Sequence, residues 1–565
     1  MTGSAERSEQ ETAELDAQAP DPAGPGTTKE PASGRPISRR TMLQAAGALG
    51  VGGVGLVAGY TLRGILDEPA SMPPAASSAP GGGAAAGPSG TSSPNVTPGA
   101  TAAAEADAAP PASLVHAFRS APDLAPPVMS VGTPARATAG GWLFTSPDNG
   151  HGPVALVIYD EAGNPVWVRP GDGRYATNLH VVSWSGRPAL AWWEGEATVG
   201  VGDGEFVIVD ERYLEIARLA AGTHADLHEL LLTPDGTAIY VSYEKIPASD
   251  GDAGTAPPRQ LFDCVVREVD LATGTPTFEW HSARHIGIDE SSAPVPDDPS
   301  VPHDPVHVNA VDIDDDGNLL VSARNTSCVY KVDRTTGEVR WRMGGTRSDI
   351  ALAPGLDFAL QHDARRQADG TITIFDNRRP PEAARGIVLA VDEQAMTARL
   401  VRTFERDQAL QAASQGSLQV LPNGNVLVGW GSQAVMTEFD ASGSILFDAT
   451  LPAGVQSYRD RRYPWTGRPA DPPALAVDPV RSASGTQQRV TAYASWNGAT
   501  EVAAWALEAG GDAGPMTRLA TQPRTGFETV LTGVTTLERV GRVQAVALDA
   551  LGSELGRSAV VEPPG

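Results

Sequence analysis

Three histidines, His228, His307 and His362, hold a similar place in successive stretches of the chain, since each precedes the glycine of a predicted hairpin turn by eight to ten residues. An imidazole can serve as a nucleophile, an acid or a base near neutral pH. A single histidine is more often structural, but three in register favour one shared site. His180 and Gln415 hold nearly the same place in the neighbouring stretches.

Two further polar residues are expected beside these histidines. Asn309 follows His307 by two residues, so both side chains lie on the same face of the predicted strand. Arg324 ends the next strand, where a buried guanidinium needs an anionic partner. That partner is either Asp363, in a structural salt bridge, or a bound sulfuryl or phosphoryl group, because a planar guanidinium suits tetrahedral oxyanions.

These residue types favour the transfer of an anionic group. One histidine would attack and carry the group, and a second would protonate the leaving oxygen and later activate an acceptor hydroxyl. Arg324 and Asn309 would hold the charged oxygens. The chain contains neither a GxxxxGK[ST] segment nor a GxSxG segment. We therefore expect no nucleotide donor, no cofactor and no metal ion.

A repeated element predicts the fold. An Asp, a turn Gly and an apolar or aromatic residue recur six times, at spacings of roughly 50 to 60 residues. The copies are Asp160…Gly163…Trp167, Asp270…Gly274…Trp280, Asp333…Gly337…Trp341 and Asp440…Gly443…Phe447, with weaker ones at Asp210 and Asp392. Hairpin turns such as Pro234-Asp235-Gly236 precede most copies. Each unit is therefore expected to hold two hairpins, hence four antiparallel strands.

We predict an all-β protein in which residues 114–473 form a six-bladed β-propeller. An array of β-sandwiches is the alternative. Strands near Leu114 or beyond Phe447 would close the ring. The first strand of each propeller blade lines the central channel, so the three histidines would lie around one mouth of that channel. Residues 474–565 hold short strands without the repeat and predict a small β-sandwich of the fibronectin type III or immunoglobulin type.

The amino-terminal part of the sequence predicts an export signal or membrane anchor, followed by a linker. Residues 1–38 are polar and indicate a disordered tail. Two adjacent arginines open the segment 39–66, and the uncharged run 41–62 that follows indicates a twin-arginine export signal or a membrane anchor. Residues 67–113 are rich in Pro, Ala, Gly and Ser and predict a flexible linker. We expect the body to be extracytoplasmic, secreted or membrane-anchored, with the twin-arginine export machinery as a partner.

Charge and cysteine content limit the possible partners. The formal net charge of −26 argues against nucleic acid, which needs a basic face. The surface is expected to be acidic and solvated. Cys264 and Cys328 lie far apart, lack metal-ligand spacing and form at most one disulfide.

The stretch from Phe118 to Trp465 resembles the bacterial arylsulfotransferases that work without a nucleotide sulfate donor, and an actinobacterial type more than the enterobacterial enzymes. The segments that carry the resemblance in combination are 225–229 (ADLHE), 307–309 (HVN), 320–325 (LVSARN), 361–366 (QHDARR) and 421–426 (LPNGNV).

The resemblance implies a six-bladed propeller and a ping-pong transfer of sulfate from an aryl sulfate to a phenol. It implies that His362 is the transiently sulfated nucleophile and that His228 and His307 assist. It also implies that Asn309 and Arg324 bind sulfate oxygens. Some members of that family carry a short Cys-closed loop close to the nucleophile, whereas no cysteine lies near His362 in this sequence.

Other functions compete with this one. Three histidines could bind a divalent cation in a propeller hydrolase or lactonase, with Asp226 or Asp363 completing the shell, although a neighbouring Arg disfavours a cation. A tethered propeller could also bind a ligand or the cell wall without catalysis. The tryptophans of the repeats are also compatible with a quinone-dependent dehydrogenase. Their equivalent positions in the outer hairpins instead indicate packing within the blades.

Overall fold

The structure, a computed structural model, describes residues 114–148, 155–171, 173–198, 200–220, 222–248 and 260–564. The tail, signal or anchor, and linker expected over residues 1–38, 39–66 and 67–113 lie outside these residues, so export and tethering stay predictions. Within the described ranges, no helix is long and apolar enough to cross a membrane.

Regular structure in the described residues is almost entirely β-strand, which confirms an all-β protein. The exceptions are short 3₁₀ turns, η2 (Ser282–Arg284), η3 (Ile288–Glu290) and η4 (Gly431–Gln433).

Up to residue 463 the strands fall into six successive antiparallel groups of four, of which the second and third are joined into one eight-stranded sheet. The first group is β28 (Arg461–Tyr463), β2 (Trp142–Thr145), β4 (Ala155–Tyr159) and β5 (Pro165–Pro170). The second is β6 (Tyr175–Trp184), β7 (Arg187–Thr198), β8 (Val201–Val209) and β9 (Glu215–Leu219). The third is β10 (Ala225–Leu232), β11 (Thr237–Pro247), β12 (Gln260–Asp270) and β13 (Pro276–His281).

Three more groups follow along the chain. The fourth is β14 (Val308–Ile313), β15 (Leu319–Ala323), β16 (Cys328–Val332) and β17 (Val339–Gly344). The fifth is β19 (His362–Arg366), β20 (Ile372–Asp376), β21 (Arg385–Asp392) and β22 (Thr397–Phe404), with β18 (Ala351–Leu352) parallel to β22. The sixth is β23 (Ser417–Val420), β24 (Val426–Gly429), β25 (Val435–Phe439) and β26 (Ile445–Thr450).

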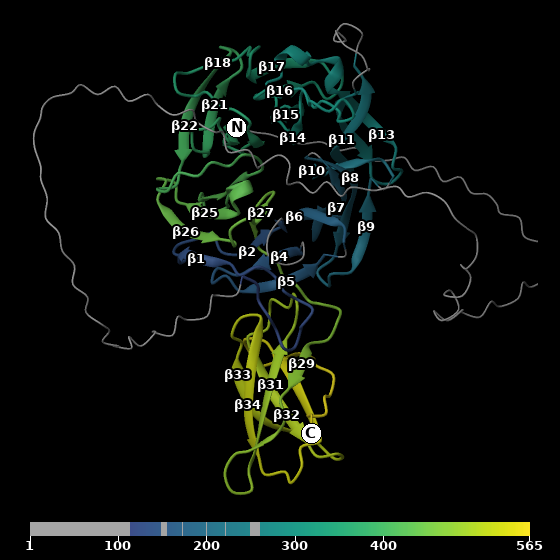
Figure 1. Ribbon diagram of the computed structural model, residues 1–565, viewed down its shortest axis with the longest axis vertical. Coiled ribbons are helices and arrows are strands. Elements are labelled where there is room, and N and C mark those ends of the chain that lie inside the picture. Colours follow the sequence, from purple (N-terminus) through teal and green to yellow (C-terminus); the bar gives the residue numbers. More distant parts are fainter. Residues whose placement is uncertain are drawn as a thin grey trace, which may run out of the picture. The chain divides into compact units, whose positions relative to one another are not determined.

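Figure 1 shows these groups arranged around a common centre. Their first strands contact one another in the order β6, β10, β14, β19, β23 and β28, and β28 in turn contacts β6. A hydrophobic cluster joins each group to the next, as where Val241 of β11 and Val321 of β15 share one cluster. The sixth and first groups share a cluster too, which includes Met436 and Leu143.

Both ends of this region take part in the pairing. Strand β28, which follows the sixth group in the chain, pairs with β2, and β1 (Ser130–Thr133), which precedes the first group, pairs with β26. The short strands β3 (Pro147–Asp148) and β27 (Gln456–Ser457) also pair with each other. Strands from before the first group and from beyond Phe447 therefore both pair with the opposite end of the region, and closure of a ring stays a prediction.

The repeated Asp of the sequence caps the turn between the third and fourth strands of each group. Asp160 Oδ1 accepts the backbone N–H groups of Ala162 at 2.9 Å and Asn164 at 2.8 Å. The same capping recurs at Asp210, Asp270, Asp333, Asp392 and Asp440. A short carboxylate can reach the N–H groups of its own turn, and Gly163, at a φ of 82°, supplies the left-handed residue. The repeat in the sequence is thus the repeat of one turn.

Irregular pairing marks the start of the first strands. Register shifts occur between Thr177 and His180, Ala225 and Leu230, Val308 and Ala310, and His362 and Arg365. Left-handed residues lie at or beside three of these shifts, with φ of 60° at Asn178, 57° at His307 and 55° at Asp363. A β-bulge bends its strand and redirects side chains, so these irregularities aim the residues at the strand starts.

The last part of the chain forms two further sheets. One is β29 (Ala474–Val477), β31 (Gln488–Ser495), β30 (Arg481–Ser482) and β34 (Glu528–Thr535). The other is β33 (Thr517–Pro523), β32 (Ala504–Gly510), β35 (Arg542–Leu548) and β36 (Glu554–Arg557). Val490, Trp505 and Leu531 belong to the one hydrophobic cluster that the two sheets share, which is the arrangement of a β-sandwich.

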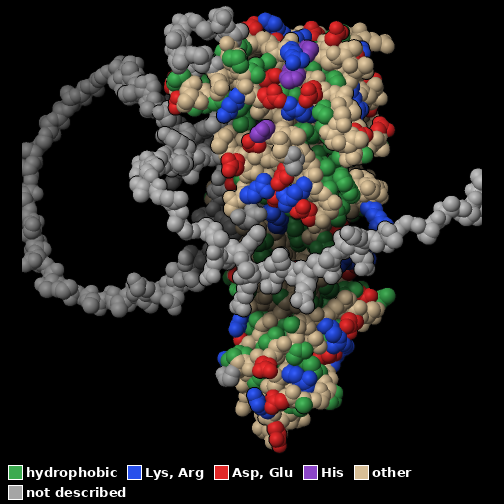
Figure 2. Space-filling model, turned by 90° about the vertical axis from the view of Figure 1, so that its right-hand side faces the viewer, with side chains coloured by type: hydrophobic (Ala, Val, Ile, Leu, Met, Phe, Trp, Pro, Cys, Tyr) green, Lys and Arg blue, Asp and Glu red, His purple; other side chains and the backbone are tan. Residues whose placement is uncertain are grey.

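Cysteine and surface charge can be compared with the sequence. Cys264 and Cys328 are both buried and free, so neither is used in a disulfide. On the face drawn in Figure 2, acidic and basic side chains are interspersed, and no basic stripe stands out on that face.

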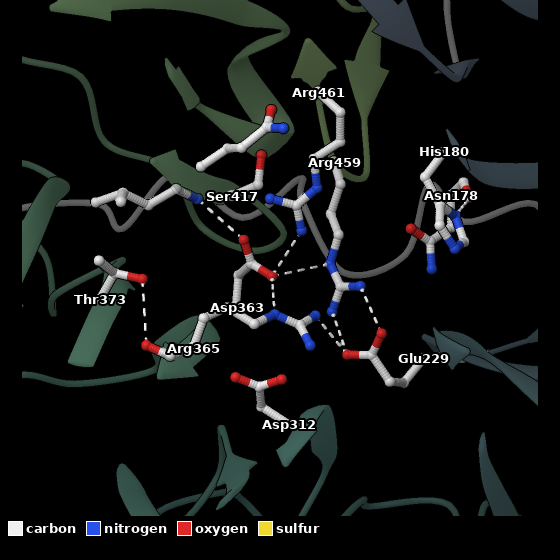
Figure 3. Close-up of polar contacts among 12 residues, drawn as sticks. Asn178, His180, Glu229, Asp312, Asp363, Arg365, Thr373, Ser417, Arg459 and Arg461 are labelled. Atoms are coloured by element: carbon white, nitrogen blue, oxygen red, sulfur yellow. Dashed lines mark hydrogen bonds and ion pairs between the residues drawn. The ribbon is translucent and has the colours of Figure 1, made fainter. Parts of the chain in front are cut away.

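Five charged side chains meet where the first strands converge, and we call them the axial ion cluster: Glu229, Asp363, Arg365, Arg459 and Arg461 (Figure 3). Arg365 bridges Glu229 Oε2 at 2.5 Å and Asp363 Oδ1 at 2.9 Å. Arg461 Nη2 lies 2.8 Å from Asp363 Oδ1, and Arg459 Nη2 lies 3.2 Å from Glu229 Oε2. The two carboxylates are fully or almost fully buried.

The axial ion cluster also binds the backbone of neighbouring strands. Asp363 Oδ2 accepts the N–H of Leu418 in β23 at 3.0 Å. Glu229 Oε2 accepts the N–H of Val311 in β14 at 3.2 Å, and Arg365 donates to the carbonyl of Val311 at 2.7 Å. Side chains from β10, β19 and β28 and backbone from β14 and β23 therefore meet in one network.

Asp363 is the most connected carboxylate of the axial ion cluster, and its loss should destabilise the fold. Burial alone would raise the pKa of Asp363, but Arg461, Arg365 and Arg459 together hold it well below its usual range. Asp363→Asn leaves buried guanidinium groups without their partner, so we expect the free energy of unfolding to fall by about 3–5 kcal/mol. Urea denaturation followed by tryptophan fluorescence measures the loss.

The pH dependence checks the cause. A depressed carboxyl pKa stabilises the fold above the unfolded pKa of about 3.9 and loses this effect as the pH falls below it. The difference between wild type and Asp363→Asn should therefore shrink in acid. Asp289→Asn, at an exposed pair with Arg347, is the matched control and should cost about 1 kcal/mol or less. An Asp363→Asn protein as stable as this control would contradict the role of the cluster.

Candidate active site

The structure brings the three predicted histidines together. His228 lies in β10, His307 directly before β14, and His362 opens β19. The rings of His228 and His307 meet edge to face, with their centroids 4.8 Å apart. The charges of both act on the pKa of His362, and His228 and His362 are almost fully buried. Together with Arg324, we call these residues the histidine cluster.

Two of the three histidines have a carboxylate partner. His307 Nδ1 lies 2.6 Å from Asp304 Oδ2, and His228 Nδ1 makes a short contact with Asp226 Oδ1. Asp226 is itself held by the backbone, since its Oδ2 accepts the N–H of Gly202 at 2.6 Å. A carboxylate on Nδ1 stabilises the protonated ring and leaves Nε2 to give or take a proton, which suits an acid or a base.

His362 has an amide partner instead. Its Nδ1 lies 2.7 Å from Asn377 Oδ1. The Asn377 amide nitrogen donates to the carbonyl oxygens of Ala412 and Gln415, both at 3.0 Å, so its Oδ1 is the atom left to accept from His362. The proton of the neutral ring therefore lies on Nδ1, and the lone pair lies on Nε2. In agreement, Nε2 accepts the backbone N–H of Gln415 at 3.2 Å.

Burial and charge keep His362 neutral. Burial lowers its pKa well below 6.5, the positive charge of Arg324 lowers it further, and the hydrogen bond with Asn377 opposes these effects only in part. Burial also lowers the pKa of His307, but Asp304 acts in the opposite direction. The histidine cluster thus holds one imidazole that is kept neutral with an amide on Nδ1 and two whose Nδ1 atoms face carboxylates.

Arg324 is the cation of the site. Its guanidinium donates to Asn325 Oδ1 at 2.8 Å and to the carbonyl of Ala413 at 3.1 Å, and no ion pair joins it to a carboxylate of the described residues. Asp363, the alternative partner considered from the sequence, binds the arginines of the axial ion cluster instead. A half-buried guanidinium without a carboxylate is suited to an anionic ligand.

The Asn309 side chain forms a hydrogen bond with the backbone beside His362. It is fully buried, and its amide nitrogen donates to the carbonyl of Gln361 at 2.7 Å. Its Oδ1 has no hydrogen-bond partner among the described residues. Asn309 therefore connects β14 to the residue before His362, and its role in binding sulfate oxygens stays a prediction.

The two residues at equivalent positions in the neighbouring groups have different surroundings. His180 lines a cavity of about 270 Å³ together with Arg365, Arg459 and Arg461 of the axial ion cluster, and burial lowers its pKa to about 4. Gln415 contacts His362 through its backbone N–H and not through its side chain. The repeat register therefore placed three of the five residues in one cluster.

Sequence reasoning missed the partners that distinguish the histidines. Asp226 and Asp304 precede His228 and His307 by two and three residues, so a search for carboxylates near each histidine could have found them. Asn377 lies 15 residues after His362, directly after β20, whose pairing with β19 brings its amide to the histidine, and the sequence offered no reason to select this amide. In the described part of the chain, no group of three or more His, Cys, Asp or Glu side chains is placed to hold a metal ion.

These features define a class: an all-β protein with a buried histidine cluster and an arginine free to bind an anion. Residues 180–451 match the family model described as arylsulfotransferase (ASST). The match covers slightly less than half of the chain and shows similarity to this family. The segment includes all three histidines, Asn309, Arg324 and Asn377. The closer resemblance to an actinobacterial type stays a prediction.

Other comparisons are weaker. The search of curated proteins found no match. A protein of unknown function from Bacteroides caccae is 12% identical, covers 57% of this chain and 98% of its own, and superposes with a TM-score of 0.36. A catalytically inactive virginiamycin B lyase from Staphylococcus aureus is 9% identical, covers 64% of this chain and 95% of its own, and has a TM-score of 0.29. At these TM-scores neither likeness carries weight for the fold or the function.

The electrostatic coupling within the histidine cluster can be measured directly. Arg324→Gln removes a positive charge that lowers the pKa of His362, so that pKa should rise. NMR titration of the protein with ¹³C-labelled histidine measures it, with the His362 signal assigned from its loss in His362→Gln. Arg340→Gln removes the same charge from an exposed pair with Asp333 and should leave the titration unchanged. An unchanged His362 titration in Arg324→Gln would disprove the coupling.

Proposed function

We propose that the protein transfers a sulfuryl group from an aryl sulfate to a phenol by a ping-pong mechanism through His362. The observation that carries this proposal is the difference between the Nδ1 partners, an amide for His362 and carboxylates for His228 and His307. The family match supports the same reaction in general. We further propose that the six strand groups are the blades of a propeller, since the first strands contact one another in a closed order.

In the first half-reaction, the Nε2 lone pair of His362 attacks the sulfur of the aryl sulfate. An N–S bond forms, the bond from sulfur to the aryl oxygen breaks, and its electron pair stays on that oxygen. The imidazolium form of His228 or His307 gives the leaving oxygen a proton, so a phenol departs. The hydrogen bond from the Gln415 N–H to Nε2, at 3.2 Å, must break before the attack, because it occupies the lone pair that attacks.

In the second half-reaction, an acceptor phenol gives its proton to the same imidazole as its oxygen attacks the sulfur. The N–S bond breaks, and its electron pair returns to Nε2 of His362. Arg324 binds the sulfuryl oxygens in both halves, since no ion pair joins its guanidinium to a carboxylate within the described ranges. The hydrogen bond that His362 Nδ1–H donates to Asn377 Oδ1 stays in place throughout, because the reaction uses only Nε2.

We also propose that the protein acts outside the cytoplasm, tethered or released through residues 39–66. The reaction fits this location, because both half-reactions need only the two small molecules and no nucleotide. The support for export itself is the amino-terminal sequence alone.

The role of His362 is tested with the full chain, 4-nitrophenyl sulfate as donor and phenol as acceptor, without nucleotide. We expect acceptor-dependent release of 4-nitrophenol, which falls by about a thousandfold or more in His362→Ala because the nucleophile is lost. Without acceptor, ³⁵S-labelled donor should label the wild type but not this variant. His224→Ala, at an exposed histidine paired with Asp203, is the control and should keep full activity. Equal release from wild type and His362→Ala would exclude the mechanism.

Asn377 should act as a positioning residue. Asn377→Ala removes the nearer acceptor of the Nδ1 proton, at 2.7 Å, and leaves the Leu360 carbonyl at 3.1 Å, so kcat should fall by roughly 10²-fold while KM changes little. Asn377→Asp keeps an acceptor and adds a negative charge. It should therefore raise the pKa of His362 and move the acid limb of the kcat profile to higher pH. A loss of stability alone would not move that limb, so an unshifted limb in Asn377→Asp would contradict this role.

A further inference from the structure

A cavity of about 360 Å³ lies beside the histidine cluster, and we call it the side pocket. Its wall continues two segments of the site, since Thr326 follows Arg324 by two residues and Ala359 precedes His362 by three. Ser327, also in the wall, accepts the N–H of Leu360 at 3.2 Å through its Oγ. The side pocket therefore borders the backbone segments that carry Arg324 and His362.

Arg379 is an exposed cation of the side pocket. Its Nη2 donates to the hydroxyl oxygens of Ser292 at 3.0 Å and Ser327 at 3.3 Å, and the described residues offer it no ion pair with a carboxylate. Ser292 in turn donates to the carbonyl of Asn325, the residue after Arg324. Burial lowers the pKa of Arg324, and the charge of Arg379 lowers it further, so the two cations act on one region.

The remaining charges of the side pocket are largely paired. Glu382 Oε1 lies 2.8 Å from Arg378 Nη2. Glu290 is buried and lies 3.5 Å from guanidinium groups outside the pocket wall. Asp357 is exposed and makes no ion pair within the described ranges. Arg379 and Asp357 are thus the two charged residues of the side pocket that form no ion pair within the described ranges, so both can interact with a charged ligand.

The chemistry of the other lining residues indicates what kind of ligand fits. Six of the sixteen residues in the wall carry a hydroxyl group: Ser291, Ser292, Thr326, Ser327, Thr346 and Ser348. Phe358 supplies an aromatic wall residue between Asp357 and Ala359. An arginine held only by hydroxyl groups keeps donors for a carboxylate or sulfonate, which it can bind in a bidentate manner.

We propose that the side pocket receives the end of the aryl substrate opposite the reacting oxygen, and that Arg379 selects phenols that carry a second, anionic group. The inference rests on the proposed sulfotransfer. Because donor and acceptor use His362 in turn, the same pocket serves both, and the preference applies to anionic aryl sulfates as well as to anionic phenols. Asp357 limits this preference, because its carboxylate repels the same group.

The test compares two acceptors, 4-hydroxybenzoate and the uncharged phenol, with 4-nitrophenyl sulfate as donor and the full chain as enzyme. The readout is the ratio of their kcat/KM values. Arg379→Gln should lower this ratio about ten- to a hundredfold, as expected for the loss of a charge-assisted hydrogen bond. Asp357→Asn should raise the ratio. Arg340→Gln has the same net charge as Arg379→Gln and lies at an exposed pair, so it should leave the ratio unchanged.

Calorimetric binding of 4-hydroxybenzoate to wild type and Arg379→Gln separates this inference from the proposed function. Sulfotransfer with an unchanged ratio in Arg379→Gln overturns the inference and leaves the function standing. No sulfotransfer, but weaker binding to Arg379→Gln, overturns the function and supports the pocket. No sulfotransfer and equal binding overturns both.

Discussion

The axial ion cluster is the constraint on which the rest of the structure depends. Five first strands meet at Glu229, Asp363 and their arginines, either through side chains or through backbone groups. Charges buried at this depth are tolerated only when they are paired, so each strand must arrive in one position along its neighbours. That requirement fixes how far each first strand is shifted along its neighbours. It therefore also fixes the relative positions of the residues at the strand starts.

The histidine cluster is built directly on this constraint. Asp363 of the axial ion cluster is the residue after His362, and Glu229 is the residue after His228, so the neighbours of two cluster histidines are held by ion pairs. The left-handed Asp363 and His307 turn adjacent side chains to different sides of the strand start. The axial ion cluster and the histidine cluster are therefore built on the same backbone segments.

The hydrogen-bond partners on Nδ1 then distinguish the three histidines. The three imidazoles are alike as residue types, yet a carboxylate supports a protonated ring and an amide supports a neutral one with a defined tautomer. Arg324 lowers the pKa of His362, and in the proposed mechanism the same cation also binds the sulfuryl oxygens. The Asn377 amide links this arrangement to the segment that carries Gln415, since it binds both at once.

The sequence by itself determined the local features. The turn Asp recurs because its carboxylate caps its own turn, so the strand groups were visible as a repeat. The shared offset of His228, His307 and His362 predicted one cluster, because equivalent positions in equivalent units converge. Only the tertiary structure decided the long-range partners. Asn377 contacts His362 from the end of the paired strand β20. Asp363 binds Arg365, Arg459 and Arg461 rather than Arg324, and two of these arginines lie nearly 100 residues away. Such choices depend on which side chains the folded backbone brings within hydrogen-bonding distance, and spacing along the chain does not encode that distance.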